Sequence, residues 1–124
     1  MDNWISFPKK ELMLDIYLGE QNMDDNTLLF WNQVKISPEI WRSTDFIEDD
    51  FWVVALHENY LIWYNDIEEG FDISRFKIKG EILEYGASHN ELNFAVIELK
   101  KRIEFIQNKK PEVKLLVFLL YNFE

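Results

Sequence analysis

The densest group of reactive side chains in this sequence is a set of carboxylates on both flanks of an apolar, aromatic stretch. These acids are Glu48, Asp49, Asp50, Asp66, Glu68 and Glu69, with Asp72 close by in sequence. Carboxylates held within a few ångströms repel one another and oppose folding, unless they fan out into water, bind a cationic protein or hold a divalent metal. Their spacing does not match a helix–loop–helix calcium site. We therefore expect a cationic protein partner or plain solvation rather than a metal.

Other catalytic signals in the sequence are weak. Two carboxylates can act as general acid and base, but a chain with 23 acids gives that pairing almost no specificity. Neither His57 nor His89 lies in a metal-ligand spacing such as HExxH, and we interpret them as a surface histidine and a helix-cap histidine. The sequence has no cysteine, no G-x-S-x-G motif and no glycine-rich phosphate loop. We predict no catalytic residue, no bound metal and no cofactor.

Aromatic residues next to the acids are candidate contacts for lysine and arginine side chains. Trp63 and Tyr64 lie just before the second group of acids, separated from it by Asn65, and we expect them at the rim of an interface. Trp63 and Trp52 also fall in predicted strands, where the large area of such rings favours burial in the core. For Trp63 the sequence leaves both positions open.

The chain is strongly acidic, because 23 Asp and Glu against 13 Lys and Arg give a formal net charge of −10. Nucleic acids and anionic membranes repel such a chain, so we expect neither as a partner. The charge favours either solubility alone or steering toward a basic protein partner. A length of 124 residues predicts a single domain, residues 1–124, with one core.

Three features predict a cytoplasmic location. The lack of cysteine suits a reducing compartment. The N-terminal segment has an early acid and no uninterrupted apolar run, so it does not match a secretory signal. The apolar run Leu115–Tyr121 is far shorter than the ~20 residues of a membrane span.

A predicted β-hairpin at about 51–66 would position the acids. Its halves are apolar and rich in aromatic and β-branched residues, and Glu58-Asn59 would form a two-residue turn. The pairs predicted by this turn are His57 with Tyr60, Ala55 with Ile62, Val54 with Trp63, Val53 with Tyr64 and Trp52 with Asn65. The two acidic flanks would then meet at the open end of the hairpin. Because both faces are apolar, we expect central strands that are covered on both sides.

The remaining patterns predict several short elements and one clear helix. Alternation in Leu12–Leu18 predicts a strand, whereas Ser37-Pro38-Glu39 predicts the start of a short helix. Leu28–Ile36 fits neither period. Further strands are predicted around Phe76–Ile78 and at Leu115–Leu120.

The clear helix lies at about 89–107. Ser88 and Glu91 fit a capping box, and apolar residues recur at helical spacing from Leu92 to Ile106, which makes one buried stripe. Together the elements predict an α+β fold. It has a mostly antiparallel sheet with a central hairpin, this main amphipathic helix packed on the sheet, and a C-terminal strand.

Two segments resemble a group of small bacterial proteins. They are FWVVALHENYLIWYNDIEEGFDIS (Phe51–Ser74) and EYGASHNELNFAV (Glu84–Val96). The group looks like immunity proteins of polymorphic toxin and contact-dependent inhibition systems, so the resemblance implies a non-enzymatic protein that neutralises a toxin domain. Nuclease toxins need basic surfaces to hold phosphate, and an acidic inhibitor can occupy such surfaces. The resemblance supplies no toxin-contacting residues.

Two other functions stay open. One is a small hydrolase that uses clustered carboxylates, with or without a divalent metal. The other is a structural or regulatory subunit in which the two-sided apolar hairpin packs against another chain. We favour the immunity-type binding protein, with a basic protein partner held by the six acids and by Trp63 and Tyr64.

Overall fold

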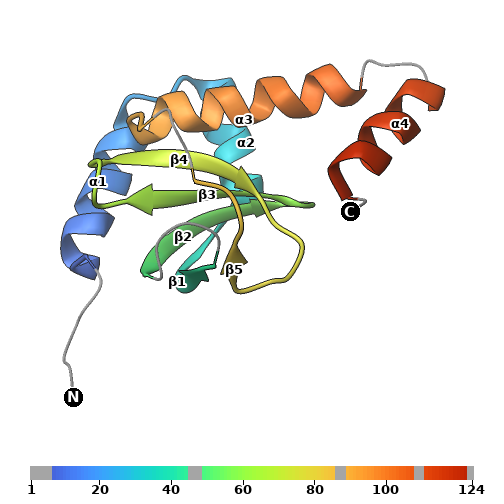
Figure 1. Cartoon of the computed structure of the whole chain (residues 1–124). Helices are drawn as coiled ribbons and strands as arrows, with labels where there is room; N and C mark the ends of the chain where they lie inside the picture. The colour runs from blue at the N-terminus through green and yellow to red at the C-terminus, as the bar shows by residue number, and fades with distance from the viewer. Residues whose placement is uncertain (1–6, 45–48, 86–88, 108–110, 123–124) are drawn as a thin grey trace.

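The computed structural model describes residues 7–44, 49–85, 89–107 and 111–122, which form four helices and a five-stranded sheet (Figure 1). The elements are α1 (Lys9–Gln21), α2 (Asp25–Val34), β1 (Lys35–Ser43), β2 (Asp50–His57), β3 (Tyr60–Asn65), β4 (Gly70–Arg75), β5 (Glu81–Ile82), α3 (Leu92–Gln107) and α4 (Pro111–Asn122). The strand order is β4-β3-β2-β1-β5, with β5 parallel to β1 and the other neighbours antiparallel. The predicted α+β class is confirmed.

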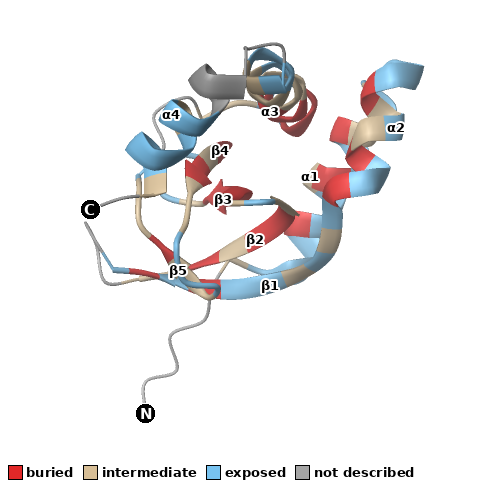
Figure 2. Cartoon of the chain, turned by 90° about the vertical axis from the view of Figure 1, so that its right-hand side faces the viewer, coloured by how far each residue is buried: buried red, intermediate tan, exposed pale blue. Residues whose placement is uncertain are grey.

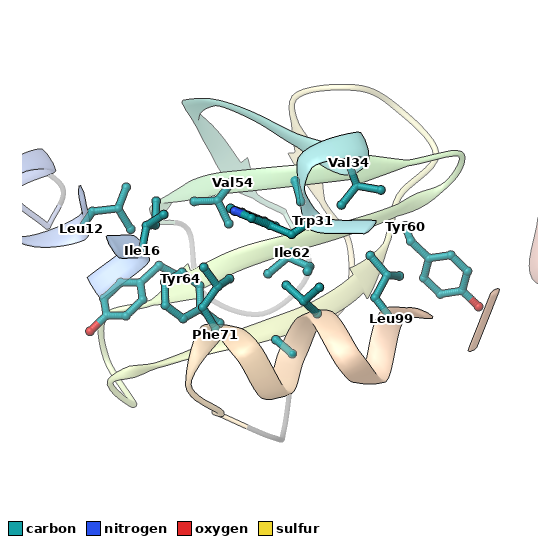
Figure 3. Packing of buried hydrophobic residues seen from close by; sticks show 14 residues of the cluster. Leu12, Ile16, Trp31, Val34, Val54, Tyr60, Ile62, Tyr64, Phe71 and Leu99 are labelled. Carbon is teal, nitrogen blue, oxygen red and sulfur yellow. The ribbon is translucent and has the colours of Figure 1, made fainter. Parts of the chain in front are cut away.

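The central strands β2 and β3 are covered on both faces. Helices α1, α2 and α3 cover one face (Figures 1 and 2), where Leu12, Trp31, Ile62 and Leu99 share one core cluster (Figure 3). A second buried cluster consists of Trp41, Phe51, Val53, Leu61, Trp63 and Ile82. Successive residues of β3 alternate between the two clusters because strand side chains point to opposite faces. The apolar hairpin is therefore covered on both sides by this chain itself.

The predicted hairpin is confirmed near its turn and differs in register farther away. The pairs that agree are His57 with Tyr60 and Ala55 with Ile62, across the turn at Glu58 and Asn59. The pairs that are wrong are Val54 with Trp63, Val53 with Tyr64 and Trp52 with Asn65. Trp63 instead pairs with Val53, and Tyr64 with Trp52, because the register shifts between Val53 and Ala55. Such a bulge adds one residue to one strand, and apolar side chains on both faces hide it from the sequence pattern.

The predicted strand at Leu12–Leu18 is wrong, because these residues lie in helix α1. Leu12, Ile16 and Gly19 are buried at helical spacing, whereas Leu14 and Leu18 are exposed. The exposed Leu14 and Leu18, together with the buried Leu12 and Ile16, produce an alternation of apolar residues that resembles a strand pattern. The helix is rich in Lys, Glu, Leu and Met, which favour helical structure.

The region that fitted neither period divides into two elements, with α2 ending at Val34 and β1 beginning at Lys35. The helix start predicted at Ser37-Pro38-Glu39 is therefore wrong. Pro38 cannot donate to a strand ladder, and it lies where the β1–β2 register shifts, between Lys35 and Glu39. The irregularity accommodates the proline within the strand.

The strand predicted around Phe76–Ile78 is also wrong. Strand β4 ends before it and β5 begins after it. Phe76 still packs against the second cluster. Gly80 then adopts a φ of 101°, a conformation that glycine reaches without a steric penalty.

Helix α3 is confirmed, but it begins at Leu92 rather than at about 89. His89 has a φ of 52°, and Asn90 forms an isolated bridge with Phe71 of β4. These residues attach to the sheet instead of starting the helix. Ser88 of the predicted capping box lies outside the described residues.

The predicted C-terminal strand is wrong, because Leu115–Leu120 belong to helix α4. Periodicity cannot separate a strand from a helix in a short apolar run. Leucine favours a helix, and proline suits the first helical position, which Pro111 occupies. Among the described helices, none is long and apolar enough to cross a membrane.

Replacement of Gly70 by Ala should destabilise the fold strongly. An added Cβ atom would lie 2.3 Å from the carbonyl carbon of His89, which is backbone and cannot rotate away. We expect urea denaturation to show a loss of about 2–3 kcal/mol in the free energy of unfolding. Gly80→Ala is the comparison, because its Cβ meets nothing within 4 Å and only backbone strain of about 1 kcal/mol applies. Equal losses in both variants would contradict the close approach at Gly70.

Candidate functional site

The hairpin brings the two acidic flanks to one end of the sheet, as predicted. Asp49 and Asp50 lie at the start of β2, and Asp66, Glu68 and Glu69 occupy the turn between β3 and β4. Continuing the shifted register places Asp50 across from Asp66. Glu48 lies outside the described residues.

Helix α1 adds a carboxylate that the sequence did not indicate. The Asp15 carboxylate and the Tyr64 hydroxyl lie close enough to affect each other's pKa. Burial and then the neighbouring Glu11 raise the pKa of Asp15, and the Tyr64 hydroxyl offsets part of this rise. We name one group the acidic end: Asp15, Asp49, Asp50, Asp66, Glu68 and Glu69.

Several of these carboxylates raise the pKa of a neighbouring group. Burial raises the pKa of Asp66, and the Asp49 carboxylate raises it further. The pKa of Tyr64 rises to about 12, first through burial and then through the charges of Asp15, Glu69 and Asp66. A negative potential opposes further ionisation in each case. Asp15 of α1, Asp49 at the start of β2, and Asp66 and Glu69 of the β3–β4 turn thus add to one negative potential around Tyr64 and Asp66.

Arg42 of β1 lies beside the acidic end. Its guanidinium is 3.9 Å from the Asp50 carboxylate; the Arg42 side chain is exposed and the Asp50 side chain is partly exposed. An exposed ion pair of this kind contributes little to stability, so a partner can displace it at small cost. Within the described ranges, no group of three or more His, Asp or Glu side chains is arranged to hold a metal ion.

Asn65 holds the acidic turn in place. Its buried side chain accepts hydrogen bonds from the backbone N–H groups of Ile67 and Glu68, both at 3.1 Å. Its amide nitrogen donates to Asp72 at 3.2 Å. Asn commonly shapes turns in this way. The carboxylates of the turn are therefore presented by an ordered backbone.

The buried carboxylate of Asp72 fastens the segment before α3 to β4. It accepts a hydrogen bond from the backbone N–H of His89 at 2.7 Å, and its second oxygen lies 3.0 Å from Nδ1 of the same residue. A carboxylate beside an imidazole also occurs in acid–base catalysis. Here the Asp72 carboxylate binds both the backbone and the ring of His89, so the pair holds this segment against β4. The sequence did not indicate this pair, because 17 residues separate its members.

A cavity of about 370 Å³ lies next to the acidic end, between α1, the acidic turn and the start of α3. Its wall includes the carboxylates of Asp15, Glu69 and Glu91, together with Tyr64 and His89. The cavity is large enough for a long side chain and is lined by acids on three elements. Lysine and arginine side chains match this lining.

The predicted placement of Trp63 and Tyr64 at an exposed rim does not agree with their burial. Trp63 is fully buried, and its indole N–H donates to the Ser74 hydroxyl at 2.9 Å. Tyr64 is buried on the opposite face and reaches the cavity. Both lie on β3, which is covered on both sides. The exposed apolar side chains in this region are Ile67 of the acidic turn and Leu18 of α1, which the sequence did not single out.

Comparison of the chain with protein-family models, with curated proteins and with solved structures found no match.

Replacement of Asp66 by Asn should stabilise the fold slightly at neutral pH. The pKa of Asp66 is raised in the folded state, so its protonated form favours folding and its ionised form opposes folding. This cost is fully present above the folded pKa and disappears below the unfolded pKa of about 3.9. We expect a gain on the order of 0.5 kcal/mol near neutral pH, because solvent screens a partly exposed group. Urea titrations should show no gain at about pH 3.

Asp24→Asn is the matched control with the opposite sign. Hydrogen bonds from Thr27 lower the pKa of Asp24, so its charge stabilises the fold above the unfolded pKa and this contribution is lost as pH falls. The control should lose stability at neutral pH. A loss of similar size in Asp66→Asn would contradict the unfavourable burial of the Asp66 charge.

Proposed function

We propose that this chain is a non-enzymatic protein-binding module whose acidic end engages a cationic protein surface. The observation that carries the proposal is the convergence of carboxylates from α1, β2 and the β3–β4 turn. Burial raises the pKa values of Asp15 and Asp66, and the neighbouring carboxylates of Glu11 and Asp49, respectively, raise them further, so the arrangement costs folding energy. Lysine or arginine side chains from a partner would relieve that cost on binding.

The cavity beside the acidic end suits one arginine or lysine side chain of the partner. A guanidinium has donors in a planar fork and can bond two carboxylate oxygens at once. Asp15 and Glu69 offer such oxygens from facing elements. Leu18 in the cavity wall and Ile67 in the turn are exposed, and they supply apolar contacts that strengthen an interface at its centre.

Within this class, we propose an immunity-type protein of a bacterial toxin system that acts in the cytoplasm against a nuclease-type toxin domain. Nuclease surfaces are basic because they hold phosphate. A net charge of −10 speeds encounters with such surfaces. The resemblance of Phe51–Ser74 and Glu84–Val96 to immunity proteins supports the same reading. The acidic turn held by Asn65 needs little reordering on binding, which favours tight association.

The triple variant Asp66→Asn, Glu68→Gln, Glu69→Gln should lose binding to cationic ligands. Calorimetric titration with an oligoarginine peptide should show a Kd at least ~10-fold higher than for the parent chain. Added salt should weaken the parent's binding, because it screens the attraction between opposite charges. If a basic toxin domain is encoded beside this chain, co-expression should protect cells from it, and the triple variant should protect poorly.

A control variant that loses the same number of negative charges distinguishes the contribution of the acidic end from that of the net charge. The control variant is Asp25→Asn, Glu58→Gln, Glu104→Gln, which removes three exposed acids that lie outside the acidic end. It should retain affinity within about threefold. An equal loss of affinity in both variants would mean that only the net charge matters. Binding by the parent chain that does not weaken with added salt would rule out the acidic end as the binding site.

A further inference from the structure

Helix α4 exposes an unusually apolar surface. Six of the eight residues from Leu115 to Asn122 are large apolar residues with exposed fractions between 42% and 68%; they are Leu115, Leu116, Phe118, Leu119, Leu120 and Tyr121. The same stretch contains no charged residue. A helix that is apolar all round is normally buried, so a covering surface is expected for α4.

The body of the protein covers α4 only loosely. In Figure 1 helix α4 lies beyond the C-terminal end of α3 and to one side of the sheet. Figure 2 shows most of its described residues as exposed. One contact with the body is made by Tyr121, whose ring centroid lies 4.2 Å from the Arg75 guanidinium carbon. Cavities of about 370, 590 and 200 Å³ lie between α4 and its neighbours. A well-packed interior leaves few such spaces.

The exposed area of α4 reaches the scale of a specific interface. Fully exposed large apolar residues present on the order of 150–250 Å² each, so the six exposed fractions correspond to roughly 600 Å². Two copies of this surface would bury up to roughly 1,200 Å², whereas a specific interface needs ~1,000 Å². A single additional copy of the chain is therefore sufficient to cover the helix.

A second copy also matches the chemistry of the surface. In a two-fold interface each copy contributes the same patch, so one apolar helix meets another. A cationic partner would find no carboxylate between Leu115 and Asn122. The helix borders the hairpin turn at Glu58 and Asn59, at the opposite end of β2 and β3 from the acidic end.

We propose that α4 forms the interface of a homodimer. Leu115, Leu116 and Leu119 of each copy lie at the centre of the contact, because they are exposed and line none of the three cavities that face the body, and the exposed side chains of Phe118 and Leu120 extend the contact on either side. The acidic ends of both copies stay open in this arrangement. The dimer does not depend on the function proposed for the acidic end.

Sedimentation velocity of the full chain tests the dimer. The expected mass is twice the monomer mass of 15.0 kDa at micromolar concentration, and it should persist or increase with added sulfate, which strengthens apolar burial. Leu116→Glu with Leu119→Glu should raise the dimer Kd at least ~100-fold, because the interface would bury unpaired charges. The matched control, Leu14→Glu with Leu29→Glu, changes two exposed leucines of α1 and α2 and should leave the dimer intact.

Two further measurements keep the test independent of folding defects. The Leu116→Glu, Leu119→Glu variant should keep the far-UV circular dichroism spectrum and the cooperative urea unfolding of the parent chain, which shows that the fold is intact. Because the chain has no cysteine, a single Leu116→Cys change should give a disulfide-linked dimer on mild oxidation, whereas Leu29→Cys should not.

Three results would overturn the proposal. The first is a monomer at every concentration. The second is a dimer that survives both glutamates in α4, which would place the interface elsewhere. The third is a monomer that co-sediments with phosphatidylcholine vesicles through α4, which would make lipid the covering surface.

Discussion

Burial of β3 on both faces is the constraint on which the rest of the structure depends. All six of its residues are buried. Ile62 packs with the helix-covered cluster, and Leu61 and Trp63 pack with the opposite one. Each such side chain contributes roughly 1.5–3 kcal/mol when fully buried. Charged residues can therefore lie only beyond the ends of this strand, and this is where the acidic turn begins.

The sequence predicted the elements in which composition and periodicity agree. The hairpin and helix α3 combine a clear pattern with a recognisable beginning or turn, and both exist. Helices α1 and α4 were predicted as strands because their exposed leucines disguise the helical period. Pro38 suggested a helix start, although it lies at an irregularity of β1. In each case the deciding factor is which face meets the rest of the protein, and one sequence does not contain that information directly.

The part of the candidate site that depends on the hairpin was predictable from the sequence, and the part that depends on other elements was not. Antiparallel pairing of β2 and β3 sufficed to bring Asp49, Asp50 and the acidic turn together. Asp15 was missed because it comes from an element that was assigned to the wrong class. For Trp63 the core and the interface rim both stayed open, because the sequence shows that it adjoins the acids but does not show that a second cluster covers its face. The Asp72–His89 pair depends on a long-range contact that no local pattern indicates.

The borders of the sheet restrict how other molecules can attach to it. Strand β5 has only two residues, and the outer side of β4 is occupied at Phe71, which exchanges backbone hydrogen bonds of 2.7 and 3.0 Å with Asn90. The outer part of β1 carries Pro38, which cannot donate. Blunted borders of this kind discourage the addition of a foreign strand and the growth of fibrils. Recognition by this protein is consequently left to side chains, whose charge and shape can be selective, rather than to a backbone ladder that any extended peptide could join.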